Sequence, residues 1–340
     1  MKIVFASNKN SHFVTITEYI ENALRRVATQ VVFFDDMNFI FPGRIRDRLP
    51  YLSMLELKRV NKLLLSKIRG IKPDLFLAAG GHRILSDTVA AIKREGVKTA
   101  LWTIDVPQNF EPIRASAPYY DGTFTGGSEA YDILKDAGVT NLHWLPFGCD
   151  PDFHRPQKVT DSEARLYGCD IAFTGTVDPE LYPGRFQLLE AISDYDLGVW
   201  GPGSEKIPVS SPLRKRIRGA HTAPKVWTKI YSQAKIVLCI HYNDPAGVIP
   251  CHQASPRVYE ALACGTFLMV DGQKDVFALF KNREDLVVFR DSVELRDLIS
   301  YYLQRPGERQ RIAKTGREKA LAGHTYQHRI TKLLEIVGQA

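Results

Sequence analysis

The stretch from Gln253 to Val270, QASPRVYEALACGTFLMV, decides the fold, because it predicts a helix followed by a buried strand. Ser255 followed by proline is typical of a helix start, where the serine hydroxyl caps the first turn and proline needs no hydrogen-bonding N–H. Gly265 ends the helix. The continuous apolar run over 267–270 is typical of a strand that is covered on both faces of a parallel sheet.

Arg257 and Glu260 lie three residues apart in this helix, so they share one face near its N-terminus. A cation and a carboxylate at a helix N-terminus, next to a parallel sheet, suit a phosphate and a pair of sugar hydroxyls. The simpler alternative is a surface ion pair between the two side chains.

The segment 257–265, RVYEALACG, resembles the R-x-x-E-A-x-A-C-G helix of GT-B glycosyltransferases, and most closely that of the CgeB-type group. The resemblance continues over 275–328 and includes 145–150 (LPFGCD) and 170–175 (DIAFTG). It covers most of the C-terminal two thirds of the chain, and the N-terminal third only loosely. It implies that Glu260 binds the ribose hydroxyls of a nucleotide-sugar donor.

Composition is that of an ordinary globular protein, with 44% hydrophobic and 24% charged residues. The length of 340 residues favours two domains. No apolar run is long enough to predict a transmembrane helix, and the start MKIVFASNKNSHF resembles a first strand more than a signal peptide. Five scattered cysteines without metal-ligand spacing favour free thiols, so we expect a cytoplasmic protein.

The net charge of +7 is compatible with nucleic acid, a membrane surface or an anionic substrate. The densest basic run is 214–218 (RKRIR), and no nucleic-acid module accompanies it, so we expect no nucleic-acid partner. Weak association with an anionic membrane stays open. Aromatic residues in 38–52 suggest a surface for a sugar or lipid acceptor, although core packing explains them equally well.

Strands and helices alternate along the whole chain, which predicts an α/β fold with parallel, doubly wound sheets. Strands are expected at 2–6, 30–34, 74–79, 97–104, 122–125, 142–145, 169–174, 196–200, 235–240, 266–270 and 286–289. In the second half, helices are expected at 184–193, 224–233, 255–264, 274–281, 292–304 and 307–321.

The resemblance implies the GT-B architecture, in which two Rossmann-like domains face each other across a cleft. We expect an acceptor-side domain at 1–150 and, after an irregular linker, a donor-binding domain at 165–324. The helix expected in 325–340 would cross back to the first domain. An irregular loop is expected over 38–49.

The donor site is expected beyond the carboxyl ends of the strands in the second domain. There Gly175 and Thr176 follow one strand, and Arg185 stands near the start of the next helix. His241 and Tyr242 follow another strand, close to the sugar that is transferred. The resemblance adds Gly201, which would lie in a turn against the donor base. The last candidate is Ser255, at the start of the helix expected at 255–264. A purely structural turn is the alternative for the glycines.

The resemblance also bears on stereochemistry. Retaining relatives carry a second glutamate eight positions before the one that binds ribose, and here His252 stands at that position. This difference favours an inverting transfer, which needs a base to accept the proton of the acceptor hydroxyl. Arg257 could replace the missing interactions by binding the diphosphate.

Candidates for the base are Asp105, His82 and His12, because each follows a predicted strand of the first domain. Asp105 is the best placed, since it belongs to a D-x-P segment that resembles one in the family. Turn capping is the alternative for Asp105. Histidines at such positions are often structural, and His82 is expected to open a helix.

No cofactor and no metal site are expected. The chain has no D-x-D segment flanked by strands, and Asp150-Pro151-Asp152 falls in the expected linker. The sequence therefore predicts a metal-independent glycosyltransferase that moves a sugar from a nucleotide-diphosphate sugar to a glycan, lipid-linked or protein acceptor. The alternatives are a nucleotide-sugar epimerase or hydrolase with the same fold, and a non-catalytic nucleotide-sugar-binding protein.

Overall fold

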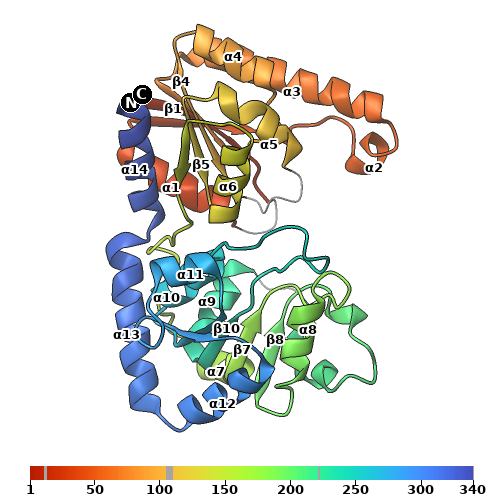
Figure 1. The fold of residues 1–340 in the computed structure, drawn as a ribbon, viewed down its shortest axis with the longest axis vertical. Helices are drawn as coiled ribbons and strands as arrows, with labels where there is room; N and C mark the ends of the chain where they lie inside the picture. The colour runs from red at the N-terminus through yellow and green to blue at the C-terminus, as the bar shows by residue number, and fades with distance from the viewer. Residues whose placement is uncertain (11–13, 105–109, 221–222, 340) are drawn as a thin grey trace. The chain divides into compact units, whose positions relative to one another are not determined.

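The computed structural model describes residues 1–340 except 11–13, 105–109, 221–222 and 340. The chain forms two compact units. Unit 1 consists of Met1–Pro146 and Gln327–Ala340, and unit 2 consists of Phe147–Tyr326. Each unit is built on a parallel sheet with helices packed against it (Figure 1). This arrangement confirms the predicted α/β class and the two Rossmann-like folds.

In unit 1 the described strands form a six-stranded parallel sheet in the order β2-β1-β3-β4-β5-β6. The strands are β1 (Lys2–Ser7), β2 (Gln30–Asp35), β3 (Leu75–Ala79), β4 (Lys98–Thr103), β5 (Gly122–Thr125) and β6 (Leu142–Trp144). The helices are α1 (Ile16–Val27), α2 (Gly43–Arg46), α3 (Pro50–Ile71), α4 (Ser86–Arg94), α5 (Glu111–Ser116), α6 (Ser128–Asp136) and α14 (Tyr326–Gln339).

The second sheet, within the described part of unit 2, has six parallel strands in the order β12-β11-β10-β7-β8-β9. The strands are β7 (Cys169–Thr174), β8 (Leu197–Trp200), β9 (Ile217–Gly219), β10 (Ala234–Cys239), β11 (Leu268–Asp271) and β12 (Val287–Phe289). The helices are α7 (Asp161–Tyr167), α8 (Pro183–Glu190), α9 (Pro224–Gln233), α10 (Pro256–Ala263), α11 (Lys274–Leu279), α12 (Ser292–Leu303) and α13 (Pro306–Gly323).

The order of the second sheet reverses between β7 and β10, which are hydrogen-bonded neighbours. From β7 the chain continues to β8 and β9 on one side, and β10 to β12 lie on the other side. Loops that leave the carboxyl ends of two such strands run in opposite directions and leave a crevice, where α/β proteins bind ligands. The topology of unit 2 therefore places a binding site after Thr174 and Cys239.

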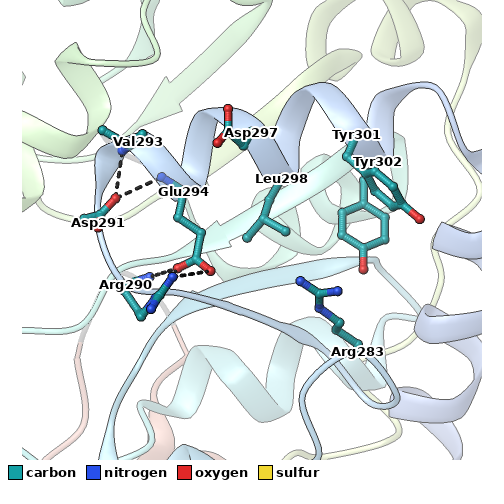
Figure 2. Close-up of a pocket in the computed structure, with 9 residues that line it drawn as sticks. All are labelled: Arg283, Arg290, Asp291, Val293, Glu294, Asp297, Leu298, Tyr301 and Tyr302. Carbon is teal, nitrogen blue, oxygen red and sulfur yellow. Dashed lines mark hydrogen bonds and ion pairs between the residues drawn. The ribbon is translucent and has the colours of Figure 1, made fainter.

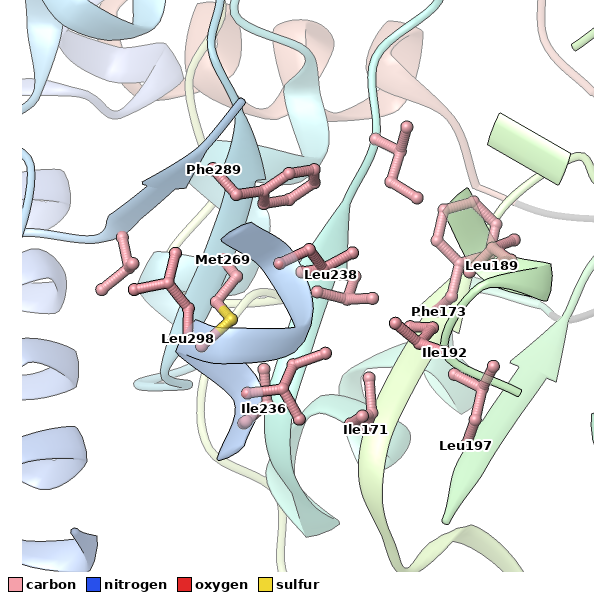
Figure 3. Close-up of a cluster of buried hydrophobic side chains, with 14 of the residues drawn as sticks. Ile171, Phe173, Leu189, Ile192, Leu197, Ile236, Leu238, Met269, Phe289 and Leu298 are labelled. Atoms are coloured by element: carbon pink, nitrogen blue, oxygen red, sulfur yellow. The ribbon is translucent and has the colours of Figure 1, made fainter. Parts of the chain in front are cut away.

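The core of unit 2 explains the continuous apolar strands in the sequence. Ile171, Leu238 and Met269 come from three neighbouring strands, and each is at most 1% exposed. Figure 3 shows them together with Phe173 and Phe289 beneath helices of the same unit. Because helices cover both faces of a parallel sheet, its strands need apolar side chains on both sides.

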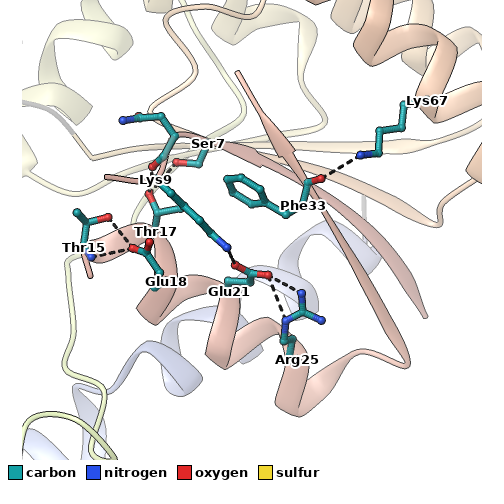
Figure 4. Close-up of polar contacts among 10 residues, drawn as sticks. Ser7, Lys9, Thr15, Thr17, Glu18, Glu21, Arg25, Phe33 and Lys67 are labelled. Atoms are coloured by element: carbon teal, nitrogen blue, oxygen red, sulfur yellow. Dashed lines mark hydrogen bonds and ion pairs between the residues drawn. The ribbon is translucent and has the colours of Figure 1, made fainter. Parts of the chain in front are cut away.

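Polar contacts at the start of unit 1 tie the residues after β1 to α1 (Figure 4). The Ser7 and Thr17 hydroxyls are 3.0 Å apart, and Lys9 pairs with Glu21. Arg25 pairs with the same carboxylate at 2.5 Å. Burial raises the pKa of Glu21, but the two cations outweigh this effect and hold it below its ordinary value.

Three local expectations were wrong. The stretch 38–49, expected to be an irregular loop, contains the short helix α2. The next helix, α3, begins at Pro50, and its first turns are mostly exposed, so the sequence shows only a weak apolar period there. A short helix, α7, begins within the expected linker and ends at Tyr167, inside the expected second domain. It is marked by a capping box between Thr160 and Glu163 instead of by an apolar stripe.

His82 does not open a helix, because α4 begins only at Ser86. The backbone at Gly80 and Gly81 has φ values of 88° and 80°, a left-handed conformation that favours glycine. The N–H of Ile84 donates to the Gly81 carbonyl at 3.0 Å. The chain therefore makes a further turn, which contains His82, before the helix starts.

Candidate functional site

Arg185 joins the two loops that leave β7 and β10. From α8, its guanidinium group donates one hydrogen bond to the Thr176 carbonyl at 2.8 Å and another to the Ile240 carbonyl at 2.7 Å. The side chain also lies over the ring of Tyr182, 4.2 Å from its centroid. Arg185 is thus fixed at the point where the strand order of the sheet reverses.

Arg257 brings a second cation to the same place from the first turn of α10. A Cβ built on Gly175 would lie 3.5 Å from a guanidinium nitrogen of Arg257, so the arginine lies close to this loop. Burial, together with the charge of Arg257, lowers the pKa of Arg185 to about 10. The two cations therefore repel each other inside unit 2.

Neither guanidinium group has a carboxylate partner within 4.0 Å among the described residues, and the Nε atoms of Arg185 and Arg257 are buried without a hydrogen-bond acceptor there. Such buried donors cost free energy unless a partner satisfies them. An anion between the two arginines would supply acceptors and remove the repulsion. The N-terminus of α10 adds its partial positive charge at this point.

His241 and Asp271 fix the entrance of α10. The backbone N–H of His241 donates to Asp271 Oδ1 at 2.9 Å, and Nδ1 of the ring lies 2.6 Å from the same oxygen. The other ring nitrogen, Nε2, accepts the backbone N–H of Ser255 at 3.0 Å. Because Nε2 is an acceptor, the ring is neutral and carries its proton on Nδ1.

This network makes His241 a positioning residue, since both ring nitrogens are already engaged. Burial raises the pKa of Asp271, but its electrostatic interaction and its hydrogen bonds with His241 outweigh burial and keep the pKa below its ordinary value. Ser255 also caps α10, as its Oγ accepts the backbone N–H of Arg257 at 3.4 Å. Asp271, at the carboxyl end of β11, was not among the sequence candidates.

Glu260 lies one turn further along α10 and is only 5% exposed. Burial raises the pKa of its carboxyl to about 7, against the opposing effect of Arg257. Arg257 and Glu260 do not form the surface ion pair considered as an alternative, because no contact within 4.0 Å joins them in the described structure. Glu260 is therefore a buried carboxyl group within the electrostatic influence of Arg257.

His154 is a second residue that the sequence analysis did not identify. Its Nδ1 accepts the backbone N–H of Asp150 at 3.0 Å, which leaves the proton on Nε2. That Nε2 lies 3.8 Å from Oε1 of Glu260. Burial lowers the pKa of His154 to about 4, so the ring is neutral near pH 7. A sequence signal for His154 was present, because the segment 145–150, which carries part of the family resemblance, ends four residues before it.

A cavity of about 320 Å³ opens beside this cluster. His241 and Asn243 line it from the carboxyl edge of the sheet, and Arg185 of α8 lines it together with Tyr182, the residue before that helix. The ring of Tyr242 packs edge-on against that of Tyr182, with centroids 5.6 Å apart. The cavity is large enough for part of a nucleotide sugar.

A second cavity, of about 450 Å³, lies along α12 (Figure 2). Most of the charged side chains that line it already form hydrogen bonds or ion pairs within the protein. Asp291 accepts the backbone N–H groups of Val293 and Glu294, each at 2.9 Å, and Arg290 pairs with Glu294 at 2.9 Å. Arg290 and Asp291 line both cavities. The cavity beside Arg185 is the better candidate, because Arg185 has no carboxylate partner among the described residues.

Gly201 has a packing role at the edge of the site. A Cβ at this position would lie 1.8 Å from the carbonyl oxygen of Gly175, so only glycine fits. The Gly175 N–H in turn donates to the Trp200 carbonyl at 2.9 Å. Gly201 therefore holds the turn after β8 against the turn after β7.

The three candidates for a base belong to unit 1. His82 is half-buried in the turn after β3. His12 and Asp105 lie outside the described residues. The strands that precede the three candidates, β1, β3 and β4, are neighbours in the sheet, so their carboxyl ends lie along one edge.

The basic run 214–218 is largely used within unit 2. Arg214 and Arg216 donate to the carbonyls of Ile207 and Ser193, and Arg218 pairs with Asp196 at 2.8 Å. Among the described residues, no group of three or more His, Cys, Asp and Glu side chains could hold a metal ion. None of the helices described is both long and apolar enough to span a membrane.

Comparison with known proteins agrees with this geometry. Residues 185–335 match a family model described as "Glycosyl transferase-like". The spore protein CgeB of Bacillus subtilis is 20% identical over 284 residues, which cover 80% of this chain and 85% of CgeB.

Solved structures share the fold over almost the whole chain. Sucrose-phosphate synthase from Thermosynechococcus elongatus has a TM-score of 0.72 at 14% identity, with 99% of this chain and 98% of that chain covered. The Anabaena protein HepE in complex with UDP-glucose has a TM-score of 0.71 at 12% identity, with both chains fully covered.

The two parallel sheets and the solved structures show the GT-B fold. The match of residues 185–335 to the family model and the similarity to CgeB support a glycosyltransferase of the CgeB type.

Proposed function

We propose that the protein transfers a sugar from a nucleotide-diphosphate sugar to an acceptor hydroxyl. The observation that carries this proposal is the arrangement of Arg185, Arg257 and Glu260 where the strand order reverses. Two half-buried arginines with buried Nε atoms and no carboxylate partner among the described residues suit a diphosphate. A buried carboxylate one turn further along α10 suits a ribose diol.

In this proposal the diphosphate leaves with its charge offset by Arg185, Arg257 and the N-terminus of α10, so no metal ion is required. Glu260 accepts hydrogen bonds from the ribose hydroxyls. His241 and Asp271 hold the start of α10 in place, and Tyr242 with Tyr182 walls the cavity in which the donor lies.

The donor nucleotide is the next part of the proposal. HepE, whose fold this chain shares, is known in complex with UDP and with UDP-glucose. A uridine nucleotide is therefore the first probe to use. Gly201, in the turn after β8, would lie beside the base.

We further propose that the transfer is inverting. His252 stands where retaining relatives carry a glutamate, and its backbone carbonyl accepts the N–H of Asp275 at 3.0 Å. The base would come from unit 1, with Asp105, His82 and His12 as candidates. A glycan, lipid-linked or protein hydroxyl would be the acceptor.

A thermal-shift panel tests the donor site. UDP, GDP, dTDP, CDP and ADP are each added to the wild type and to Glu260→Ala, with and without magnesium. A ligand that binds only the folded state raises the melting temperature by mass action. The proposal expects one nucleotide to stabilise the wild type without magnesium, and expects this effect to be lost in the variant.

Transfer itself is tested with the donor that the panel selects. The wild type is incubated with the nucleotide sugar and a pool of acceptors, and the anomeric configuration of the product is determined by proton NMR. An inverted configuration supports the proposed mechanism. Release of free sugar without any transfer would favour a hydrolase, and no shift with any nucleotide would contradict the donor site.

A further inference from the structure

Exposed apolar side chains are concentrated in one short part of unit 1. Half of the large hydrophobic residues that are exposed in the described structure lie between Met37 and Leu63, in less than a tenth of the chain. Tyr51 is 77% exposed, Ile40 66% and Leu49 53%. Such a concentration of exposed apolar side chains in one segment is a candidate interaction surface.

The exposed side chains of α3 form a stripe. Tyr51, Leu55, Lys58 and Lys62 are exposed and follow one another at spacings of four, three and four residues, so they lie on one helix face. The opposite face carries buried Val60, Leu64 and Ile68, which pack in the core of unit 1. The stripe is thus apolar in the first turns of α3 and basic further along.

Basic residues accompany the apolar ones. The segment 37–63 contains six Lys and Arg residues but only two acidic residues, Asp47 and Glu56. Glu56 is buried and paired with Arg59 at 3.1 Å. Five cations remain that have no ionic partner among the described residues, namely Arg44, Arg46, Arg48, Lys58 and Lys62.

We call these exposed apolar and basic side chains of 37–63 the α2–α3 surface. In Figure 1, α2 and the first turns of α3 lie on the side of unit 1 away from α14. The surface belongs to unit 1, whereas the donor site is built from residues of unit 2. Donor binding at that site therefore does not explain why the α2–α3 surface is apolar and basic.

We propose that the α2–α3 surface docks the protein on an anionic lipid bilayer. Aromatic and aliphatic side chains beside unpaired Lys and Arg are the composition of interfacial segments, in which apolar groups enter the headgroup region and cations meet anionic lipids. A protein partner or a second copy would also cover apolar side chains. The excess of unpaired cations specifies a negatively charged partner surface, and this favours the anionic bilayer.

Sedimentation with vesicles tests this proposal. The full-length protein is mixed with vesicles of phosphatidylcholine alone and with vesicles that also contain phosphatidylglycerol. The proposal expects binding only to the anionic vesicles, and expects it to weaken at high salt because charges are screened. Lys58→Glu with Lys62→Glu should weaken binding by roughly 30-fold or more. Ile40→Ser with Tyr51→Ser should weaken it at every salt concentration.

Matched variants in unit 2 control for charge and hydrophobicity. Lys281→Glu with Lys314→Glu makes the same charge change, and Val209→Ser removes a side chain that is 85% exposed. These controls should bind vesicles as the wild type does. Equal binding to neutral vesicles, an equal loss in the controls, or no vesicle binding but a dimer that Tyr51→Ser dissociates would overturn the proposal.

Discussion

Nε2 of His154 lies 3.8 Å from Oε1 of Glu260, and both side chains are buried in unit 2. Burial lowers the pKa of His154 to about 4 and raises that of Glu260 to about 7. Between about pH 4 and pH 7, both side chains are therefore mainly uncharged. The pair links the segment that opens unit 2 to the helix of the proposed donor site.

Donor binding should depend on pH through Glu260. If the ionised carboxylate accepts the ribose hydroxyls, affinity for UDP-glucose should rise as the pH increases through about 7, by up to about tenfold per unit below that value. UDP-glucose is the suitable probe, because its phosphates do not titrate in this range. Calorimetric titration between pH 5.5 and 8.5 measures the effect.

Glu260→Gln is the control for this titration, because it keeps the shape of the side chain but cannot ionise. Its affinity should be weaker at pH 8 and nearly constant with pH. A wild-type affinity that is independent of pH, or that falls as the pH rises, would show that the ionised form of Glu260 does not bind the donor.

The free energy of unfolding should depend on pH through Glu260 and His154. Glu260 binds its proton more tightly in the folded state, so its contribution is present below pH 4.5 and falls by about 3 kcal/mol as the pH rises to about 7. His154 has a lowered pKa, so its contribution rises by about 3 kcal/mol as the pH increases from 4 to 6.5. The two trends oppose each other in the wild type.

Single variants separate them. Urea unfolding of Glu260→Gln should show stability that increases more steeply from pH 4 to 6.5 than in the wild type. His154→Gln should show the opposite change, a decrease with rising pH. Parallel pH profiles for the wild type and both variants would mean that these two groups keep their ordinary pKa values.

Arg257→Ala tests the role of the second cation. The variant should lose roughly ten- to a hundredfold in affinity for UDP, because a charge-assisted hydrogen bond is lost, but little for uridine, which has no phosphate. Arg305→Ala removes an exposed arginine elsewhere in unit 2 and should bind both ligands normally. An equal loss for UDP and uridine in Arg257→Ala would contradict a phosphate contact.

The fold could be predicted from the sequence because its signals are local. Each signal is contained within a few consecutive residues, as for the apolar strands 169–174 and 266–270 and for the capped start of α10. The sheet order that places Thr176 beside Ile240 depends on contacts between distant segments, and no local pattern encodes it. Helix α7 was missed for a different reason, since a short exposed helix has no apolar period.

His241→Ala should destabilise unit 2, because it leaves Asp271 buried without its ring donor. We expect a loss of about 3 kcal/mol in the free energy of unfolding. His241→Asn can still donate to Asp271 and should lose clearly less. Urea unfolding compares them, and equal losses for both variants would mean that the hydrogen bond to Asp271 contributes little.

Gly201→Ala should lower the free energy of unfolding by about 3 kcal/mol, because the added methyl group meets the Gly175 carbonyl oxygen. Gly307→Ala is the matched control. It lies in α13 with no atom within 4 Å of the new Cβ and should gain up to about 1 kcal/mol from helix propensity. A tolerated Gly201→Ala would show that the two turns separate easily.

The candidate site was predictable only in part. Arg257, Glu260 and Ser255 stand in one segment, and Arg185 follows a strand end, so their types and spacing identify them. His154 and Asp271 come from segments more than 100 residues apart, and only the folded chain shows that they flank α10. The dual hydrogen bond of Arg185 to two backbone carbonyls has no sequence signal, because any residue supplies a carbonyl.

The most direct test of the account is a crystal structure of the protein with an intact nucleotide sugar. The account predicts that the diphosphate contacts Arg185 and Arg257 at the carboxyl ends of β7 and β10, with the ribose hydroxyls on Glu260. A nucleotide sugar bound in the cavity along α12, or bound without contact to either arginine, would contradict it.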